Sequence, residues 1–152
     1  GLLAAAHSAF LLNLGLETLA VRMERHCANA QRTAEFLESQ DAVEFVNYPG
    51  LKQNKYHALA QKYLPKGCCG VISFSIKGGR ERAAAFIDHL KMVSLEVHVA
   101  DMYSASGKLN TPELTDEQLV NCGITPGLIR LSCGIEHIDD ILEDLTQAFA
   151  QI

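Results

Sequence analysis

The sequence predicts an α/β domain built on one sheet. Segments with the period of an amphipathic helix alternate along the chain with segments in which apolar and polar residues alternate strictly. The chain has 152 residues, of which 48% are hydrophobic and 20% are charged. This length is enough for one domain with a real hydrophobic core and too short for two comfortable ones. We therefore expect one compact unit.

The first predicted element is a long amphipathic helix that opens the chain. Its apolar residues recur at intervals of three and four, at Leu12, Leu16, Leu19, Met23, Cys27, Ala30, Ala34 and Leu37. Gly15 is the weak point of this helix, because glycine loses more backbone entropy in a helix than other residues do. A short strand over residues 43–46 follows and ends at the turn Asn47-Tyr48-Pro49-Gly50.

Three further elements continue the alternation. A short helix over about residues 55–63 stops before Pro65, because the residue before a proline disfavours helical geometry. Residues 72–76 alternate between apolar side chains and serines, which is typical of a half-buried strand. After the Gly78-Gly79 turn, apolar residues over 83–90 have the spacing of another helix.

The next strand is predicted over residues 93–99, where His98 lies on the polar face. Residues 102–112 are rich in Ser, Gly, Asn and Pro and are predicted to form a loop. Thr115 is a candidate cap for a short helix over residues 116–121. The chain ends with an amphipathic helix that starts at about Ile138, where two aspartates complement the positive end of the helix dipole.

Arg130 is the first candidate for a functional residue. It lies in Ile129-Arg130-Leu131-Ser132-Cys133, where alternation buries the apolar residues on one face and places Arg130 and Ser132 on the other. We expect His98 to share this uncovered face, although a structural role for a lone histidine stays open. A planar guanidinium can bind a carboxylate through two parallel hydrogen bonds. An ion pair with an acidic residue of the same chain is the alternative.

Composition excludes several classes of function. The formal charge is −5 and basic residues are interspersed with acidic ones, so a nucleic-acid partner is not expected. Apolar runs are too short to span a bilayer and no signal peptide is recognised, so we expect no membrane contact and a cytoplasmic location. The five cysteines have neither the number nor the spacing of a disulfide framework or a zinc site, and they indicate reduced thiols.

Four separated motifs indicate a family. They span residues 13–26, 46–51, 63–81 and 129–145, and the last includes Gly134-Ile135-Glu136-His137-Ile138-Asp139-Asp140. Together they resemble the C-terminal part of the pyridoxal-phosphate (PLP) enzymes of cysteine and methionine metabolism. The Lys77-Gly78-Gly79-Arg80-Glu81 run and the last motif are most similar to the O-acetylhomoserine sulfhydrylase branch of that family.

The resemblance implies a fold-type-I PLP enzyme, in which a large domain binds the cofactor and a smaller C-terminal domain closes over the substrate. Residues 1–40 would be a long helix linking to the missing cofactor domain, and residues 41–152 the C-terminal domain. That domain has a mostly antiparallel sheet with helices packed on one face. The parent enzyme would bind a small amino-acid substrate and form a homo-oligomer, expected to be a tetramer.

The resemblance also assigns residues. The arginine that binds the substrate α-carboxylate in the family corresponds to Arg130. A segment of the family that helps to hold the same carboxylate corresponds to residues 94–101, and His98 and Val99 fall within it. The family's site-lining segment that follows is a few residues longer than Met102–Lys108 of this chain.

No catalytic, cofactor-binding or metal-binding residue is expected in this chain. In the family, the lysine that binds PLP and the acidic partner of the pyridine nitrogen lie upstream of the matched region. No cofactor-site motif surrounds the lysines present, Lys52, Lys55, Lys62, Lys66, Lys77, Lys91 and Lys108. We therefore expect the chain alone to bind no PLP and to be inactive.

The expected activity of the parent is conversion of O-acetylhomoserine and sulfide to homocysteine and acetate, a transferase step of methionine biosynthesis. One alternative is the same domain of a methionine γ-lyase or a cystathionine γ-synthase. Another is a standalone, non-catalytic binding or oligomerisation module, which the apolar stripe of the opening helix favours. A standalone protein should begin with a translational methionine, whereas this chain begins with Gly1.

Overall fold

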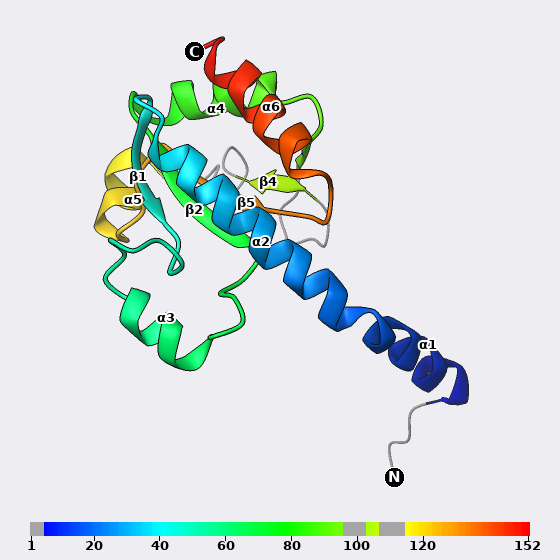
Figure 1. Cartoon of the computed structure of the whole chain (residues 1–152). Coiled ribbons are helices and arrows are strands. Elements are labelled where there is room, and N and C mark those ends of the chain that lie inside the picture. The colour runs from blue at the N-terminus through cyan, green and yellow to red at the C-terminus, as the bar shows by residue number, and fades with distance from the viewer. Residues whose placement is uncertain (1–4, 96–102, 107–114) are drawn as a thin grey trace.

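The computed structural model describes residues 5–95, 103–106 and 115–152. Figure 1 shows their helices and strands on the ribbon. In chain order these are α1 (Ala6–Glu17), α2 (Leu19–Glu38), β1 (Val43–Asn47), α3 (His57–Tyr63), β2 (Val71–Ile76), α4 (Gly79–His89), β3 (Ser94–Leu95), β4 (Ser104–Ser106), α5 (Asp116–Asn121), β5 (Leu128–Ser132) and α6 (Ile138–Phe149).

The strands form one sheet in the order β1-β2-β5-β4-β3. The pairs β1/β2, β2/β5 and β4/β5 are antiparallel, and only the short edge pair β3/β4 is parallel. The prediction of a mostly antiparallel sheet is therefore confirmed. Strand β5 lies between β2 and β4, so the last strand of the chain is a central one, in contact with a strand on each side.

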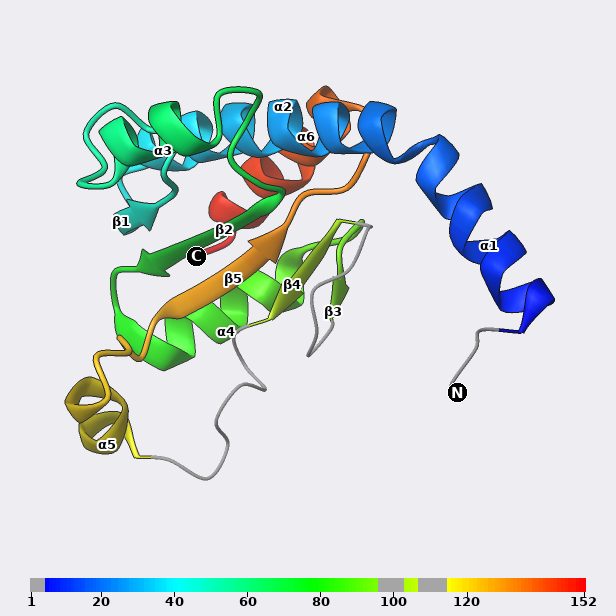
Figure 2. The ribbon, with the colours of Figure 1, turned by 90° about the horizontal axis from the view of Figure 1, so that it is seen from below.

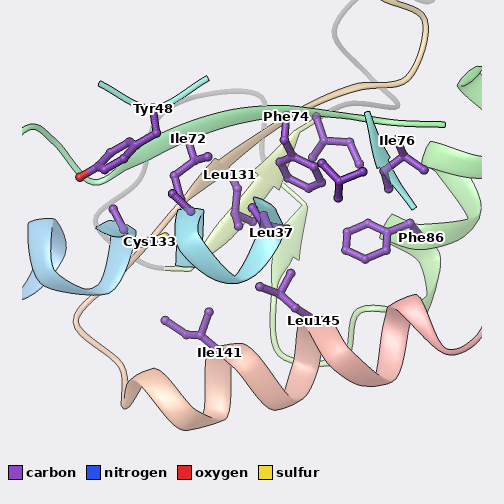
Figure 3. Close-up of a cluster of buried hydrophobic side chains, with 14 of the residues drawn as sticks. Leu37, Tyr48, Ile72, Phe74, Ile76, Phe86, Leu131, Cys133, Ile141 and Leu145 are labelled. Atoms are coloured by element: carbon purple, nitrogen blue, oxygen red, sulfur yellow. The ribbon is translucent and has the colours of Figure 1, made fainter. Parts of the chain in front are cut away.

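Helices α2, α4 and α6 cover one face of the sheet. Figure 2 shows α2 and α6 running along the same side of β2 and β5. Figure 3 shows the side chains that fill the space between these helices and the strands, including Phe74, Leu131 and Leu145. The buried ring of Phe86 in α4 stacks edge-on against Phe74 of β2, with ring centroids 6.1 Å apart. Burial of this apolar face is the main force that holds the layers together.

The predicted opening helix forms as two successive helices. The break is at Thr18, with φ −103° and ψ 0°, and not at the predicted weak point Gly15. The Arg22 side chain lies across it, with Nη2 donating to the Gly15 carbonyl oxygen at 3.1 Å. Helix α2 packs against β1, β2 and α6, and its buried residues include Ala30, Ala34 and Leu37.

Helix α1 extends away from the rest of the molecule (Figure 1) and none of its residues is buried. The predicted apolar stripe therefore packs in its second half only, whereas Leu12 and Leu16 are both more than 60% exposed. Across the described residues, no helix combines the length and the apolar character needed to cross a membrane. The division of the chain at residue 40 stays a prediction.

The middle of the chain differs from its prediction at β3 and β4. Residues 102–112 were expected to form a loop, but residues 104–106 form β4, whose pairing with β5 satisfies its backbone groups. The strand predicted over residues 93–99 is seen as β3 at Ser94–Leu95, and residues 96–99 lie outside the described residues. Strands of two or three residues are too short to show an alternating pattern.

The short helix α5 begins at the predicted residue. Thr115 accepts a hydrogen bond from the Gln118 backbone N–H, and the Gln118 side chain accepts one from the Thr115 N–H at 2.8 Å. This reciprocal capping box satisfies two backbone donors that a helix start would otherwise leave unpaired. Arg80 of α4 pairs with Asp116 at 2.8 Å and links the new helix to α4.

Asp144 of α6 fixes the chain that runs from α4 to β3. Its carboxylate is buried and accepts hydrogen bonds from the backbone N–H groups of Lys91 at 2.8 Å and Met92 at 3.2 Å. Asp144→Ala should therefore lower the free energy of unfolding by about 1–3 kcal/mol, because two donors lose their acceptor. Urea unfolding followed by circular dichroism measures this, and Glu143→Ala, an exposed change one residue earlier, is the control. Equal losses in both variants would contradict the prediction.

Candidate functional site

Arg130 lies in the middle of β5, on the face of the sheet opposite to α2, α4 and α6. Its neighbours Ile129 and Leu131 are fully buried in the core, so alternation places the half-buried Arg130 on the other face. The structure thus places Arg130 as the sequence predicted. We call this side of the sheet the polar face.

A row of polar residues crosses β1, β2 and β5 on the polar face at the level of Arg130. Asn47 of β1 is paired with Ser73 of β2, Ser73 with Arg130 of β5, and Arg130 with Ser106 of β4. Because directly paired residues point to the same face, the row gathers residues that are far apart in the sequence. We call Asn47, Ser73 and Arg130 the polar row.

Hydrogen bonds fix one end of the polar row. The Asn47 side chain donates from Nδ2 to Ser73 Oγ at 3.4 Å, close to the limit for such a bond. Its Oδ1 accepts from Nδ2 of Asn54 at 3.1 Å. Asn54, which follows β1, thereby orients the side-chain amide of Asn47. Ser73 Oγ accepts one hydrogen bond, and its own hydroxyl hydrogen can still be donated to another acceptor.

A second polar cluster lies next to the row. Ser75 is buried, and its Oγ donates to Glu44 Oε2 at 3.0 Å and accepts from Thr125 Oγ1 at 3.0 Å. The hydroxyl hydrogen of Ser75 is therefore already committed to Glu44. Among these serines on β2, the geometry leaves Ser73, beside Arg130, as the one suited to help bind an anion.

The arrangement is suited to binding and orienting a carboxylate. A guanidinium can donate two parallel hydrogen bonds to a carboxylate, and the Ser73 hydroxyl group beside it can add a further donor. Arg130 is not an isolated charge, since it already interacts with other groups of the chain. The polar row contains no nucleophile next to a base, so it offers binding and not covalent chemistry.

The lysines of the described residues do not fit a cofactor site. A lysine that forms a Schiff base usually lies in a desolvated pocket. Here every described lysine is exposed, and Lys77 instead donates from Nζ to the Asp41 carbonyl oxygen at 2.7 Å. None of them belongs to the polar row. Lys108 lies outside the described residues.

The described hollow beside α2 contains no residue of the polar row. One hollow of about 710 Å³ lies between α2 and residues 64–68, and Cys27 and Cys68 line it. Burial raises the pKa of both thiols above the usual value, which disfavours the reactive thiolate. Burial also raises the pKa of Cys133 to about 12. Within the described ranges, no group of three or more His, Cys, Asp or Glu residues could hold a metal ion.

Two of the predicted site residues cannot be placed. His98 and Val99 lie outside the described residues, so their assignment to the carboxylate stays a prediction. Ser73 and Asn47, which share the row with Arg130, were not predicted as site residues. The alternation in β2 did place Ser73 on a polar face, but only the register between the strands sets it opposite Arg130.

Several known proteins are similar to almost the whole chain. A family model described as Cys/Met metabolism PLP-dependent enzyme matches residues 1–150. An O-acetyl-L-homoserine sulfhydrylase from Leptospira meyeri is 44% identical over 95% of this chain and 34% of that protein. An L-methionine gamma-lyase from Treponema denticola is 39% identical over 95% of this chain and 36% of that protein. The chain thus spans about a third of the length of these curated relatives.

Solved structures agree with this similarity. A protein from Campylobacter jejuni, described as an O-acetylhomoserine (thiol)-lyase, matches with a TM-score of 0.84 and 38% identity. The match covers 95% of this chain and 35% of that one, which contains N'-pyridoxyl-lysine-5'-monophosphate. An O-acetylhomoserine sulfhydrylase from Wolinella succinogenes matches with a TM-score of 0.81 and 31% identity, over 95% of this chain and 39% of that one.

Proposed function

The chain belongs to the family of PLP-dependent enzymes of Cys/Met metabolism, and we propose that it is the C-terminal part of an O-acetylhomoserine sulfhydrylase. In this proposal the parent enzyme replaces the acetyloxy group of O-acetylhomoserine with sulfide and releases homocysteine and acetate. The observation that supports it from within the chain is the polar row, which sets one arginine among small polar residues on the polar face of the sheet.

Arg130 binds the α-carboxylate of the amino-acid substrate in this proposal. Its place in a central strand, between two fully buried residues, holds the backbone of the site rigid. A rigid, bidentate contact fixes both the position and the direction of the amino acid, and it turns a diffusive encounter into an oriented one. The Ser73 hydroxyl group beside Arg130 supplies an additional donor.

The cofactor of the family is PLP, which supplies an electron sink for carbanions of the substrate when it is bound. Because the described lysines are exposed and lie apart from the polar row, we assign the cofactor lysine to the part of the parent that this chain does not include. The proposed division of labour is that this domain holds the substrate carboxylate and the cofactor domain performs the chemistry.

A substrate comparison on the purified full-length parent tests the proposal. We expect homocysteine and acetate from O-acetylhomoserine only when sulfide is present, and little turnover of methionine. Formation of a 2-oxo acid from methionine at a higher rate than homocysteine synthesis would instead assign the parent to the γ-lyases. That alternative is supported by the methionine γ-lyase relatives, which are similar over the same part of the chain.

The second alternative is a non-catalytic binding or oligomerisation module. The exposed apolar residues of α1 support it, because such surfaces usually contact a partner. In the preferred proposal, α1 instead contacts the cofactor domain or another subunit of a homo-oligomer. The mass of the native gene product separates the two: a protein about three times longer is expected from the coverage of the relatives, and a product of this length would favour the module.

A further inference from the structure

The chain that leaves β5 is held by buried polar groups of α2. Asn29 donates from Nδ2 to the carbonyl oxygens of Gly134 and Glu136, each at 2.9 Å. His26, one turn earlier, lies with Nδ1 2.7 Å from the Cys133 carbonyl oxygen. Both side chains are buried, so these bonds fix residues 133–136 firmly against α2.

The carboxylate of Glu136 reaches back from this segment to β4. Its Oε1 accepts a hydrogen bond from the backbone N–H of Tyr103 at 3.0 Å. Gly134 leaves room for it, because a Cβ at that position would collide with Glu136 Oε2. Among the described residues, Oε2 is buried and has no hydrogen-bond partner.

Tyr103 connects this carboxylate to the strand beside Arg130. The tyrosine ring is buried, with 2% of its surface exposed, and its carbonyl oxygen accepts from the Ser94 N–H at 3.2 Å. Strand β4 begins at the next residue and pairs with β5, so that Ser106 lies opposite Arg130. The hydrogen bond from the Tyr103 N–H to Glu136 therefore adds to the pairing of β4 with β5 and holds the start of β4 to the segment after β5.

We propose that Glu136 is a positioning residue for the carboxylate site, because its bond to the Tyr103 N–H sets where β4 lies beside Arg130. The inference rests on the proposed role of Arg130. Strand β2 flanks Arg130 on one side through Ser73, and β4, with Glu136 bound to the residue before it, flanks Arg130 on the other. In this proposal Glu136 acts because its side chain is long enough to place Oε1 at the Tyr103 N–H, and not because it is charged.

Two substitutions in the full-length parent distinguish an effect of the length of the Glu136 side chain from an effect of its charge. Glu136→Gln removes the charge and keeps an acceptor oxygen at the same distance, whereas Glu136→Asp keeps the charge and shortens the side chain by one methylene group. We expect Glu136→Asp to raise the KM for O-acetylhomoserine about tenfold, because small misplacements of a binding group reduce productive binding. Glu136→Gln should keep that KM within about twofold, and both should leave the KM for sulfide unchanged.

The opposite order would overturn the inference, because a raised KM in Glu136→Gln with a normal KM in Glu136→Asp would mean a direct effect of charge. If Glu136→Asp does not fold, a raised KM in a folded Glu136→Gln variant is enough to overturn the inference. Folding is judged by the melting temperature and by the absorbance of bound PLP. Glu143→Ala on α6, which is exposed, is the matched control and should leave every parameter unchanged.

A double substitution distinguishes failure of this inference from failure of the proposed function. If Glu136 acts through the site of Arg130, Glu136→Asp should have no further effect on KM in the Arg130→Ala background. An additive effect would overturn the inference alone. A normal KM in Arg130→Ala itself would instead refute the proposed function on which the inference rests.

Discussion

Arg130→Ala in the full-length parent is expected to raise the KM for O-acetylhomoserine about a hundredfold, which corresponds to about 3 kcal/mol of lost binding. The physical reason is that a substrate carboxylate taken out of water would lose its two charge-assisted hydrogen bonds. Steady-state kinetics with O-acetylhomoserine as the varied substrate measures the effect. The KM for sulfide should stay the same, because sulfide has no carboxylate.

Two further variants make this prediction specific. Arg130→Lys keeps the positive charge and loses the planar fork, so it should recover only part of the binding, with a KM about tenfold above the wild-type value. Arg32→Ala on α2 removes an exposed arginine far from the polar row and should have no effect. An unchanged KM in Arg130→Ala would mean that Arg130 is a structural residue, as the ion-pair alternative holds.

Phe86→Ala is expected to have the largest effect on stability, with a loss of about 3–5 kcal/mol in the free energy of unfolding. Phe86 is fully buried, and its ring lies 6.1 Å from that of Phe74 and 4.5 Å from that of Phe149. Its removal leaves a cavity where α4, α6 and the sheet meet. Urea unfolding of the chain, followed by circular dichroism, measures the loss.

The matched control for this prediction is Phe10→Ala. Phe10 belongs to α1 and 61% of its surface is exposed, so its removal should change the free energy of unfolding by less than about 0.5 kcal/mol. Similar losses in the two variants would show that Phe86 of α4 is not packed in the hydrophobic core. A loss below about 1 kcal/mol in Phe86→Ala would lead to the same conclusion.

The elements with strong local signals were predictable from the sequence. Helix α5 spans the predicted residues 116–121 because the Thr115 and Gln118 capping box fixes its start. Strand β5 and the face that holds Arg130 followed from alternation, which depends only on neighbouring residues. The family resemblance added the antiparallel character of the sheet, which no periodicity within a single strand indicates.

The parts that depend on contacts between distant segments were not predictable. The break at Thr18 lies in a part of the chain without buried residues, since those of α2 begin at His26, and the apolar residues before the break gave the same helical pattern as those after it. Strand β4 lies in a stretch rich in serine and glycine, and its pairing with β5 fixes it. The same holds for the polar row, because the register that sets Ser73 beside Arg130 is a property of the whole sheet.

The proposed role of Arg130 is tested most directly by a crystal structure of the full-length parent with a non-reacting amino acid in its site. We expect both carboxylate oxygens to accept hydrogen bonds from the Arg130 guanidinium at about 2.7–2.9 Å, beside Ser73. A carboxylate bound elsewhere, with Arg130 paired to an acidic residue of its own chain, would contradict this role.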